Sequence, residues 1–280
     1  MEFRANVSDK INASMKKLIF LLSIILLISC KQKETKPLLQ GQKVQLVKPR
    51  VSVSNQLIDS TVTISAELRV DNIKIYYTSN GEEPSKNSKL YKQQIKISEP
   101  GIYKFKAFHT SLKESETETV EIIKKGHAVE SIVWNTQPNK KYNGKGKKTL
   151  INNSKATVSF TNKEWVGFDT IAKAAVFFKE KIFIKSIDIG YLNNPGSWIF
   201  PPQQITTHIS SDGITFIEKE VLNIKPLEEM SDQKIENIRL LIDQEIKAIR
   251  IEVKNTQEIP SWHEGKGNSA WIFMDEWIFN

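Results

Sequence analysis

Three short motifs near the end of the chain contain residues that carry out chemistry in other proteins. His263-Glu264 begins the His-Glu-x-x-His pattern of a zinc-binding helix, but position 267 is glycine and not a second histidine. Gly265-Lys266-Gly267 lacks the spacing of a phosphate-binding loop and has no helix after it. Asp275-Glu276 lies in AWIFMDEWIF, a strand pattern, so we expect the two carboxylates to point to opposite faces. A glycosidase needs carboxyl groups that face one substrate at about 5–10 Å. None of the three motifs therefore predicts an enzyme.

Aromatic and planar polar residues on two expected loops fit sugar binding better. A sugar ring stacks its apolar face on an aromatic side chain, and its hydroxyls need planar polar groups. NNPGSW and PSWHEGKGNSAW both combine such residues with proline and glycine, which favour loops. The predicted carbohydrate-binding residues are Asn194, Trp198, Trp262, His263 and Glu264.

Core packing is the competing explanation for the tryptophans. Trp271 and Trp277 are six residues apart on the final expected strand, which predicts that they lie on one face and close the fold. Trp198 could likewise brace its loop rather than contact a ligand.

Composition bounds the class of protein. The 280 residues carry a formal charge of +8, and without residues 1–29 the balance is 36 basic against 30 acidic residues, or +6. This excess is spread along the chain, and no dense basic stripe interleaved with aromatics argues for nucleic acid. A hydrophobic content of 39% is enough for a buried core.

The start of the chain predicts export. Residues 1–14 hold no apolar run, and we assign them no role. Residues 15–29 have a charged start and a short apolar run, as in a signal peptide. Leu27-Ile28-Ser29-Cys30 resembles a bacterial lipobox, which implies acylation of Cys30, the single cysteine. The alternative is an ordinary secretion signal. Residues 30–45 are polar and read as a tether, so we expect a lipoprotein of the outer membrane or cell surface.

Residues 46–126 show short alternating runs, which predict six or seven strands in a small β-sandwich. IYYTSNGEEPSKNSKLY contains a Tyr-Tyr-Thr, an Asn-Gly-x-x-Pro turn and a Ser-x-x-Tyr. This pattern resembles the immunoglobulin-like module of the chitobiase/β-hexosaminidase C-terminal type. The resemblance implies an Ig-like spacer.

Residues 127–280 hold all six tryptophans and further strand patterns, among them KAAVFF, IKSIDIGYL, NIRLLI and AIRIEVKN. We expect an eight-stranded jelly roll. HISSDGITF and WHEGKGNSAWIFMDE are similar to the discoidin, or F5/8 type C, domain at the end of family-20 β-N-acetylhexosaminidases. The predicted fold class is therefore all-β, an Ig-like sandwich followed by a discoidin-like jelly roll.

The resemblance has three further implications. In discoidin folds the binding loops cluster at one end, so the two aromatic loops should meet. The enzymes carry their catalytic residues on a separate (β/α)₈ barrel of roughly 250 residues, for which this chain has no room. Such folds also often hold a structural calcium, for which Asn152 and Glu276 are the candidate ligands, although no cofactor is required.

The predicted function is that of a membrane-anchored, non-catalytic carbohydrate-binding lipoprotein with an N-acetylhexosamine-containing glycan as ligand. The alternative is a structural or protein-docking lipoprotein that partners a separate glycoside hydrolase. A glycan screen and co-purification would separate the two.

Overall fold

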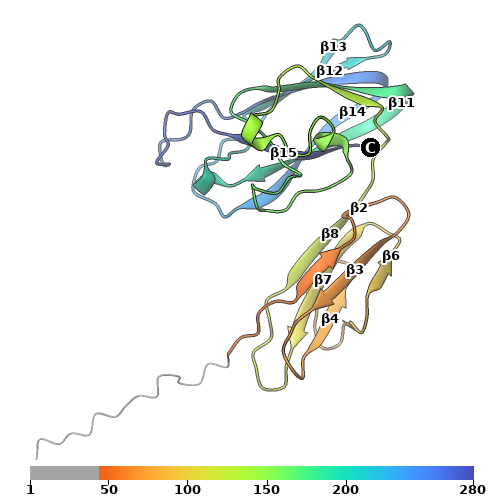
Figure 1. Cartoon of the computed structure of the whole chain (residues 1–280), viewed down its shortest axis with the longest axis vertical. Helices are drawn as coiled ribbons and strands as arrows, with labels where there is room; N and C mark the ends of the chain where they lie inside the picture. Colours follow the sequence, from red (N-terminus) through yellow and green to blue (C-terminus); the bar gives the residue numbers. More distant parts are fainter. Residues whose placement is uncertain (1–43) are drawn as a thin grey trace, which may run out of the picture. The chain divides into compact units, whose positions relative to one another are not determined.

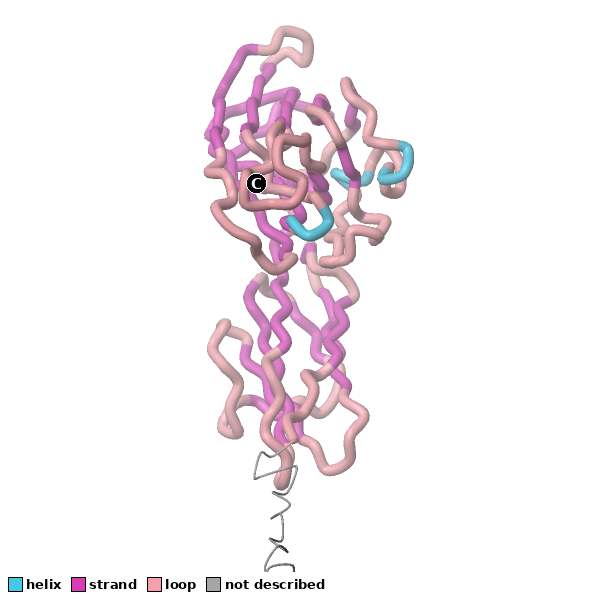
Figure 2. Tube along the Cα trace, turned by 90° about the vertical axis from the view of Figure 1, so that its left-hand side faces the viewer, coloured by secondary structure: helices cyan, strands magenta, loops and turns pink. Residues whose placement is uncertain are grey.

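The computed structural model describes residues 44–280 (Figure 1). The predicted upstream segment 1–14, the signal peptide 15–29, Cys30 and the tether up to residue 43 lie outside this range. Within residues 44–280, no helix has the length and apolar character needed to cross a membrane. Strands run through the whole described part, and its helical segments are short (Figure 2).

The first region is a sandwich of a three-stranded and a five-stranded sheet. The sheets have the orders β1-β3-β6 and β2-β8-β7-β4-β5. Alternation along β3 places Val62, Ile64 and Ala66 in the core between the sheets, as a half-buried strand requires. The strands are β1 (Arg50–Val53), β2 (Leu57–Ile58), β3 (Val62–Glu67), β4 (Lys74–Thr78), β5 (Lys89–Leu90), β6 (Ile95–Ile97), β7 (Gly101–Phe108) and β8 (Glu118–Lys124). The Ig-like prediction is confirmed. Eight strands form where six or seven were predicted, and two of the eight, β2 and β5, are only two residues long.

The second region is built on a seven-stranded sheet with the order β10-β15-β11-β14-β12-β13, and β9 pairs with β11. Its strands are β9 (Ser131–Trp134), β10 (Val166–Phe168), β11 (Ala172–Asn193), β12 (Gln204–Ser210), β13 (Ile217–Asn223), β14 (Lys234–Lys254) and β15 (Ile272–Phe279). Short 3₁₀ helices η1 (Lys140–Tyr142), η2 (Thr149–Ile151) and η3 (Pro195–Ser197) lie in its connections.

Two long strands explain why fewer strands form than predicted. KAAVFF and IKSIDIGYL both belong to β11, and NIRLLI and AIRIEVKN both belong to β14. One half of β11 pairs with β9 and the other half pairs with β15, so this strand is part of both layers of the sandwich. Register shifts after Phe177 and Ile184 let the paired strands bend between the layers. Residues of both halves, such as Val176 and Ile189, meet in one core.

A β-bulge in β15 corrects the prediction for the final strand. Ile189 pairs with Trp277 and Tyr191 with Met274, so three residue steps on β15 oppose two on β11. The alternation therefore reverses at Asp275-Glu276. Trp277 packs in the main core, whereas Trp271 packs with another cluster around Phe273. The prediction that the two tryptophans share a face was wrong, because the bulge shifts the pattern by one residue.

Candidate functional site

The first of the two aromatic loops is a tight turn after β11 with Trp198 at its tip. Asn194 and Ile199 bond to each other through both backbone N–H groups, which closes the loop at its base. Trp198 has a φ of 61°, in the left-handed region, which costs a non-glycine residue about 1–2 kcal/mol. Its N–H donates to the carbonyl of Pro195 at 2.8 Å, and its carbonyl accepts from Trp271 at 2.9 Å. The fold therefore holds a half-buried indole in a strained position, as is common at binding sites.

The second loop, residues 259–268, is folded on itself around His263. The N–H of Gly267 donates to the carbonyl of Ile259, and the N–H of Ile259 donates to that of Asn268. His263 is only 3% exposed. Its Nδ1 accepts from the N–H of Gly265 at 3.0 Å, and its Nε2 lies 3.0 Å from the carbonyl oxygen of Pro195. Because a carbonyl only accepts, Nε2 carries the proton, and His263 ties the second loop to the first.

Aromatic rings surround this histidine edge-on and bring the two loops together. The ring centroids of Trp198, Phe200 and Trp262 lie 6.0, 5.4 and 5.5 Å from that of His263, at interplanar angles of 84–86°. Gly265 packs against the Trp198 indole so closely that a Cβ there would lie 2.9 Å from the ring. A side chain at position 265 would therefore displace Trp198.

The structure places four of the five predicted residues in this cluster. Glu264 is exposed, and its Oε1 accepts from Trp198 Nε1 at 3.4 Å. Trp262 is half-buried and donates from Nε1 to the carbonyl of Leu227 at 3.1 Å. Asn194 lies at the base of the first loop, where its Nδ2 donates to Gln233 Oε1 at 3.3 Å.

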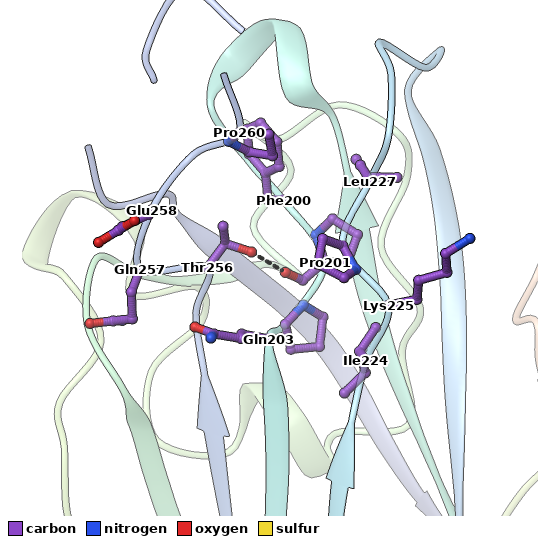
Figure 3. Close-up of a pocket in the computed structure, with 12 residues that line it drawn as sticks. Phe200, Pro201, Gln203, Ile224, Lys225, Leu227, Thr256, Gln257, Glu258 and Pro260 are labelled. Carbon is purple, nitrogen blue, oxygen red and sulfur yellow. Dashed lines mark hydrogen bonds between the residues drawn. The ribbon is translucent and has the colours of Figure 1, made fainter. Parts of the chain in front are cut away.

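A pocket of about 240 Å³ opens beside the cluster, and none of the five predicted residues lines it. Its apolar walls include Phe200 and Leu227, both of which also pack in the cluster that contains Trp262. Gln203 and Thr256 add polar groups, and Thr256 Oγ1 donates to the carbonyl of Pro201 at 3.0 Å. In Figure 3 the Lys225 side chain extends outward on one side, and Gln257 and Glu258 extend on the other.

Sequence reasoning missed this pocket because its residues come from three separate connections. The signal available was the run of prolines in FPPQQ, IKP and EIP, which contribute Pro201, Pro202, Pro226 and Pro260 to the walls. Proline fixes loop backbones, but only the fold shows that these loops are neighbours.

The two carboxylates of β15 contact the same loop, contrary to the expectation of opposite faces. Asp275 Oδ1 pairs with Lys155 Nζ at 2.6 Å, and Asp275 Oδ2 accepts from the N–H of Ala156 at 3.0 Å. Glu276 Oε2 accepts from the N–H of Asn152 at 3.0 Å. The bulge allows this because it breaks the alternation between the two positions.

The predicted calcium ligands are engaged with protein groups. Burial raises the pKa of the Glu276 carboxyl to about 8, although the N–H groups of Asn152, Asn153 and Ser154 oppose the rise. Asn152 Oδ1 accepts from the N–H of Ser154 at 2.9 Å. Calcium needs six to eight oxygen ligands, whereas N–H donors surround this carboxyl. Among residues 44–280, no group of three or more His, Cys, Asp or Glu side chains is placed to hold a metal. The donor set does not fit calcium.

We therefore expect calcium to leave the thermal stability of the chain unchanged. A tightly bound ion would add about 2.7 kcal/mol at a concentration 100 times its Kd, and Tm would rise by several degrees. Differential scanning calorimetry with millimolar calcium and with EDTA measures the difference. A rise of several degrees with calcium, reversed by EDTA, would contradict this reading of the Asn152–Glu276 loop.

The fold and the loops define an all-β protein made of two sandwich modules. Residues 54–119 match the family model of the chitobiase/β-hexosaminidase C-terminal domain, which confirms the predicted resemblance of the first module. No curated protein matches the sequence.

Solved structures with a similar fold include carbohydrate-binding modules. CpGH89CBM32-5 from Clostridium perfringens, in complex with GalNAc-β-1,3-galactose, is 10% identical, with a TM-score of 0.35 over 52% of this chain and 91% of that chain. The C-terminal domain of a chitobiase from Bacteroides fragilis is 11% identical, with a TM-score of 0.35 over 54% and 91%. A SusE-like protein is 10% identical, with a TM-score of 0.34 over 83% and 97%. These similarities concern the fold and do not assign a ligand.

Proposed function

We propose that the chain is a non-catalytic carbohydrate-binding lipoprotein of the bacterial cell surface that binds N-acetylhexosamine-containing glycans. One observation carries the proposal: segments more than 60 residues apart bring Trp198, Trp262 and Glu264 together around a buried histidine. The half-buried indoles can stack on the apolar face of a sugar ring, and the exposed carboxylate can accept hydrogen bonds from its hydroxyl groups.

The exposure of each residue indicates its role in binding. Trp198 and Trp262 provide apolar area for a sugar ring, and Glu264 and Asn194 read hydroxyl groups. His263 acts as a positioning residue, because both of its ring nitrogens are already bonded to the loops. The adjoining pocket of about 240 Å³ gives room for a further part of the glycan, such as an apolar acetamido methyl group against Phe200.

Membrane attachment belongs to the same proposal. An acylated Cys30 and the polar tether that follows would hold the modules at a membrane surface. Metabolic labelling with an alkyne fatty acid would test this directly. If the native chain is labelled and the Cys30→Ser variant is not, the result supports the anchor. If both are labelled, the acylated residue is not Cys30.

A glycan screen tests the proposed function against its alternative. Full chain applied to an array of chito-oligosaccharides, mucin glycans and galactosides should bind at least one class, with N-acetylhexosamine-containing glycans foremost. Co-purification runs in parallel. A stoichiometric hydrolase partner together with an empty array would overturn carbohydrate binding in favour of protein docking.

Replacement of Trp262 should affect both the site and its support. Trp262→Phe keeps a ring against Phe200 but removes the bond to the Leu227 carbonyl, at a cost in stability of about 0.5–1.5 kcal/mol. Trp262→Ala should also weaken glycan affinity. Denaturation and calorimetric titration of both variants measure the two effects. If the affinity of Trp262→Ala equals that of the native chain, Trp262 does not touch the glycan.

A further inference from the structure

A second pocket, of about 180 Å³, lies on the Ig-like module, which the sequence predicts to be a spacer. It forms on the outer face of the five-stranded sheet, where β4 pairs with β7. Ile75 points into the core, so its neighbours Lys74 and Tyr76 point outward. Phe108 is the direct cross-strand partner of Lys74. Lysines and aromatic rings therefore share this face.

The floor of the pocket is aromatic. The rings of Tyr76 and Phe108 meet edge-on, with centroids 5.5 Å apart. Phe108 is 7% exposed although it does not belong to the core cluster of the module. Aromatic side chains of this kind offer an apolar surface on which a ring-shaped ligand can stack.

The rim of the pocket carries positive charge without a matching carboxylate. Lys74 and Lys86 line it, and no aspartate or glutamate does. Within residues 44–280, neither lysine forms an ion pair. Two acidic residues of the same module form ion pairs with lysines that do not line the pocket: Glu114 with Lys106 at 2.7 Å and Glu83 with Lys104 at 2.6 Å.

His109 adds a donor to the same rim. Its Nδ1 accepts from the N–H groups of Ser111 and Leu112, at 3.1 and 3.2 Å. The ring proton is therefore on Nε2, which remains available to a ligand. Together with the Thr110 hydroxyl, the pocket offers hydrogen-bond donors around an aromatic floor. A ligand that fits must present acceptors and negative charge.

We propose that this pocket binds an anionic sugar, with a carboxylate or sulfate held by Lys74, Lys86 and His109 and the ring on Tyr76 and Phe108. The Ig-like module is then a second binding module and not only a spacer. The anionic character follows from the lysines, and the sugar character rests on the function proposed above. Acidic glycans would be held by this module, and neutral ones by the discoidin-like module.

Calorimetric titration of the full chain with four probes tests the proposal: an oligogalacturonate, a sulfated N-acetylglucosamine and the neutral counterpart of each. The acidic probes should bind at least about tenfold more tightly to the native chain than to Lys74→Ala/Lys86→Ala, because charge-assisted bonds are lost. Raising the salt concentration should weaken that binding. The double variant Lys92→Ala/Lys96→Ala removes the same charge from exposed positions outside the pocket and should keep the affinity.

Several results would overturn the proposal. If the two double variants lose affinity equally, the binding depends on the overall positive charge of the module and not on this pocket. The acidic probes could bind no better than neutral ones. Binding to vesicles of anionic lipid, with none to the acidic sugars, would assign the pocket to a membrane. Trp198→Ala separates the two proposals, since it should weaken neutral-glycan binding by at least about tenfold and leave oligogalacturonate binding unaffected.

Discussion

Replacement of Asp275 by alanine is expected to destabilise the second sandwich module by about 3–5 kcal/mol, because it leaves the Lys155 ammonium buried without its partner. The two side chains are 0% and 5% exposed and lie 2.6 Å apart. Asn237 Oδ1, at 3.4 Å from Lys155 Nζ, is the remaining contact. Gly190 makes this arrangement possible, since a Cβ there would overlap both Asp275 and Lys155. Equilibrium unfolding in urea measures the loss.

Two control variants make this result specific. Glu228→Ala removes an acid from a pair whose side chains are 80% and 74% exposed, and should change stability by less than about 0.5 kcal/mol. Lys155→Met/Asp275→Leu removes both charges and should recover much of the lost stability. A loss below about 1 kcal/mol for Asp275→Ala would show that water or other groups replace the aspartate.

Replacement of Trp198 by alanine is expected to reduce glycan affinity by at least about tenfold. An aromatic anchor at the centre of a binding site typically contributes 2 kcal/mol or more to affinity. The strained backbone at position 198 is held by a hydrogen bond from its N–H to the Pro195 carbonyl and by one from the Trp271 N–H to its carbonyl, and an alanine keeps both. Calorimetric titration with the glycan found on the array measures the affinity.

Two further variants distinguish stacking from hydrogen bonding at this site. Trp198→Phe keeps an aromatic face but loses the bond from Nε1 to Glu264, so it should retain more affinity than alanine. Glu264→Gln keeps the shape and removes the charge. If Trp198→Ala binds as tightly as the native chain, the indole only braces its loop and the glycan binds elsewhere.

Much of the fold could be predicted because strand alternation and turn residues are local signals. Alternation in VTISAE placed β3, and the loops with Trp198 and Trp262 were recognised by proline, glycine and aromatic residues. The prediction that these two loops meet rested on the resemblance to discoidin domains, because the residues alone do not indicate it.

The errors also have physical reasons. Every residue of β15 is buried, so polar alternation could not reveal the bulge at Asp275-Glu276. The burial of His263 could not be foreseen either, because its partner, the Pro195 carbonyl, lies 68 residues away in sequence. The pocket beside Phe200 needs three connections to come together, and none of them signals it alone.

The indole N–H signals of the six tryptophans test glycan binding at the two loops most directly. All six lie in residues 134–277, and each has one indole N–H that gives a signal in a nitrogen–proton correlation spectrum. On addition of the glycan, the signals of Trp198 and Trp262 should shift. Those of Trp165 and Trp277, which are 1% and 2% exposed, should stay in place. Unchanged Trp198 and Trp262 signals at saturating glycan would contradict a binding site at these loops.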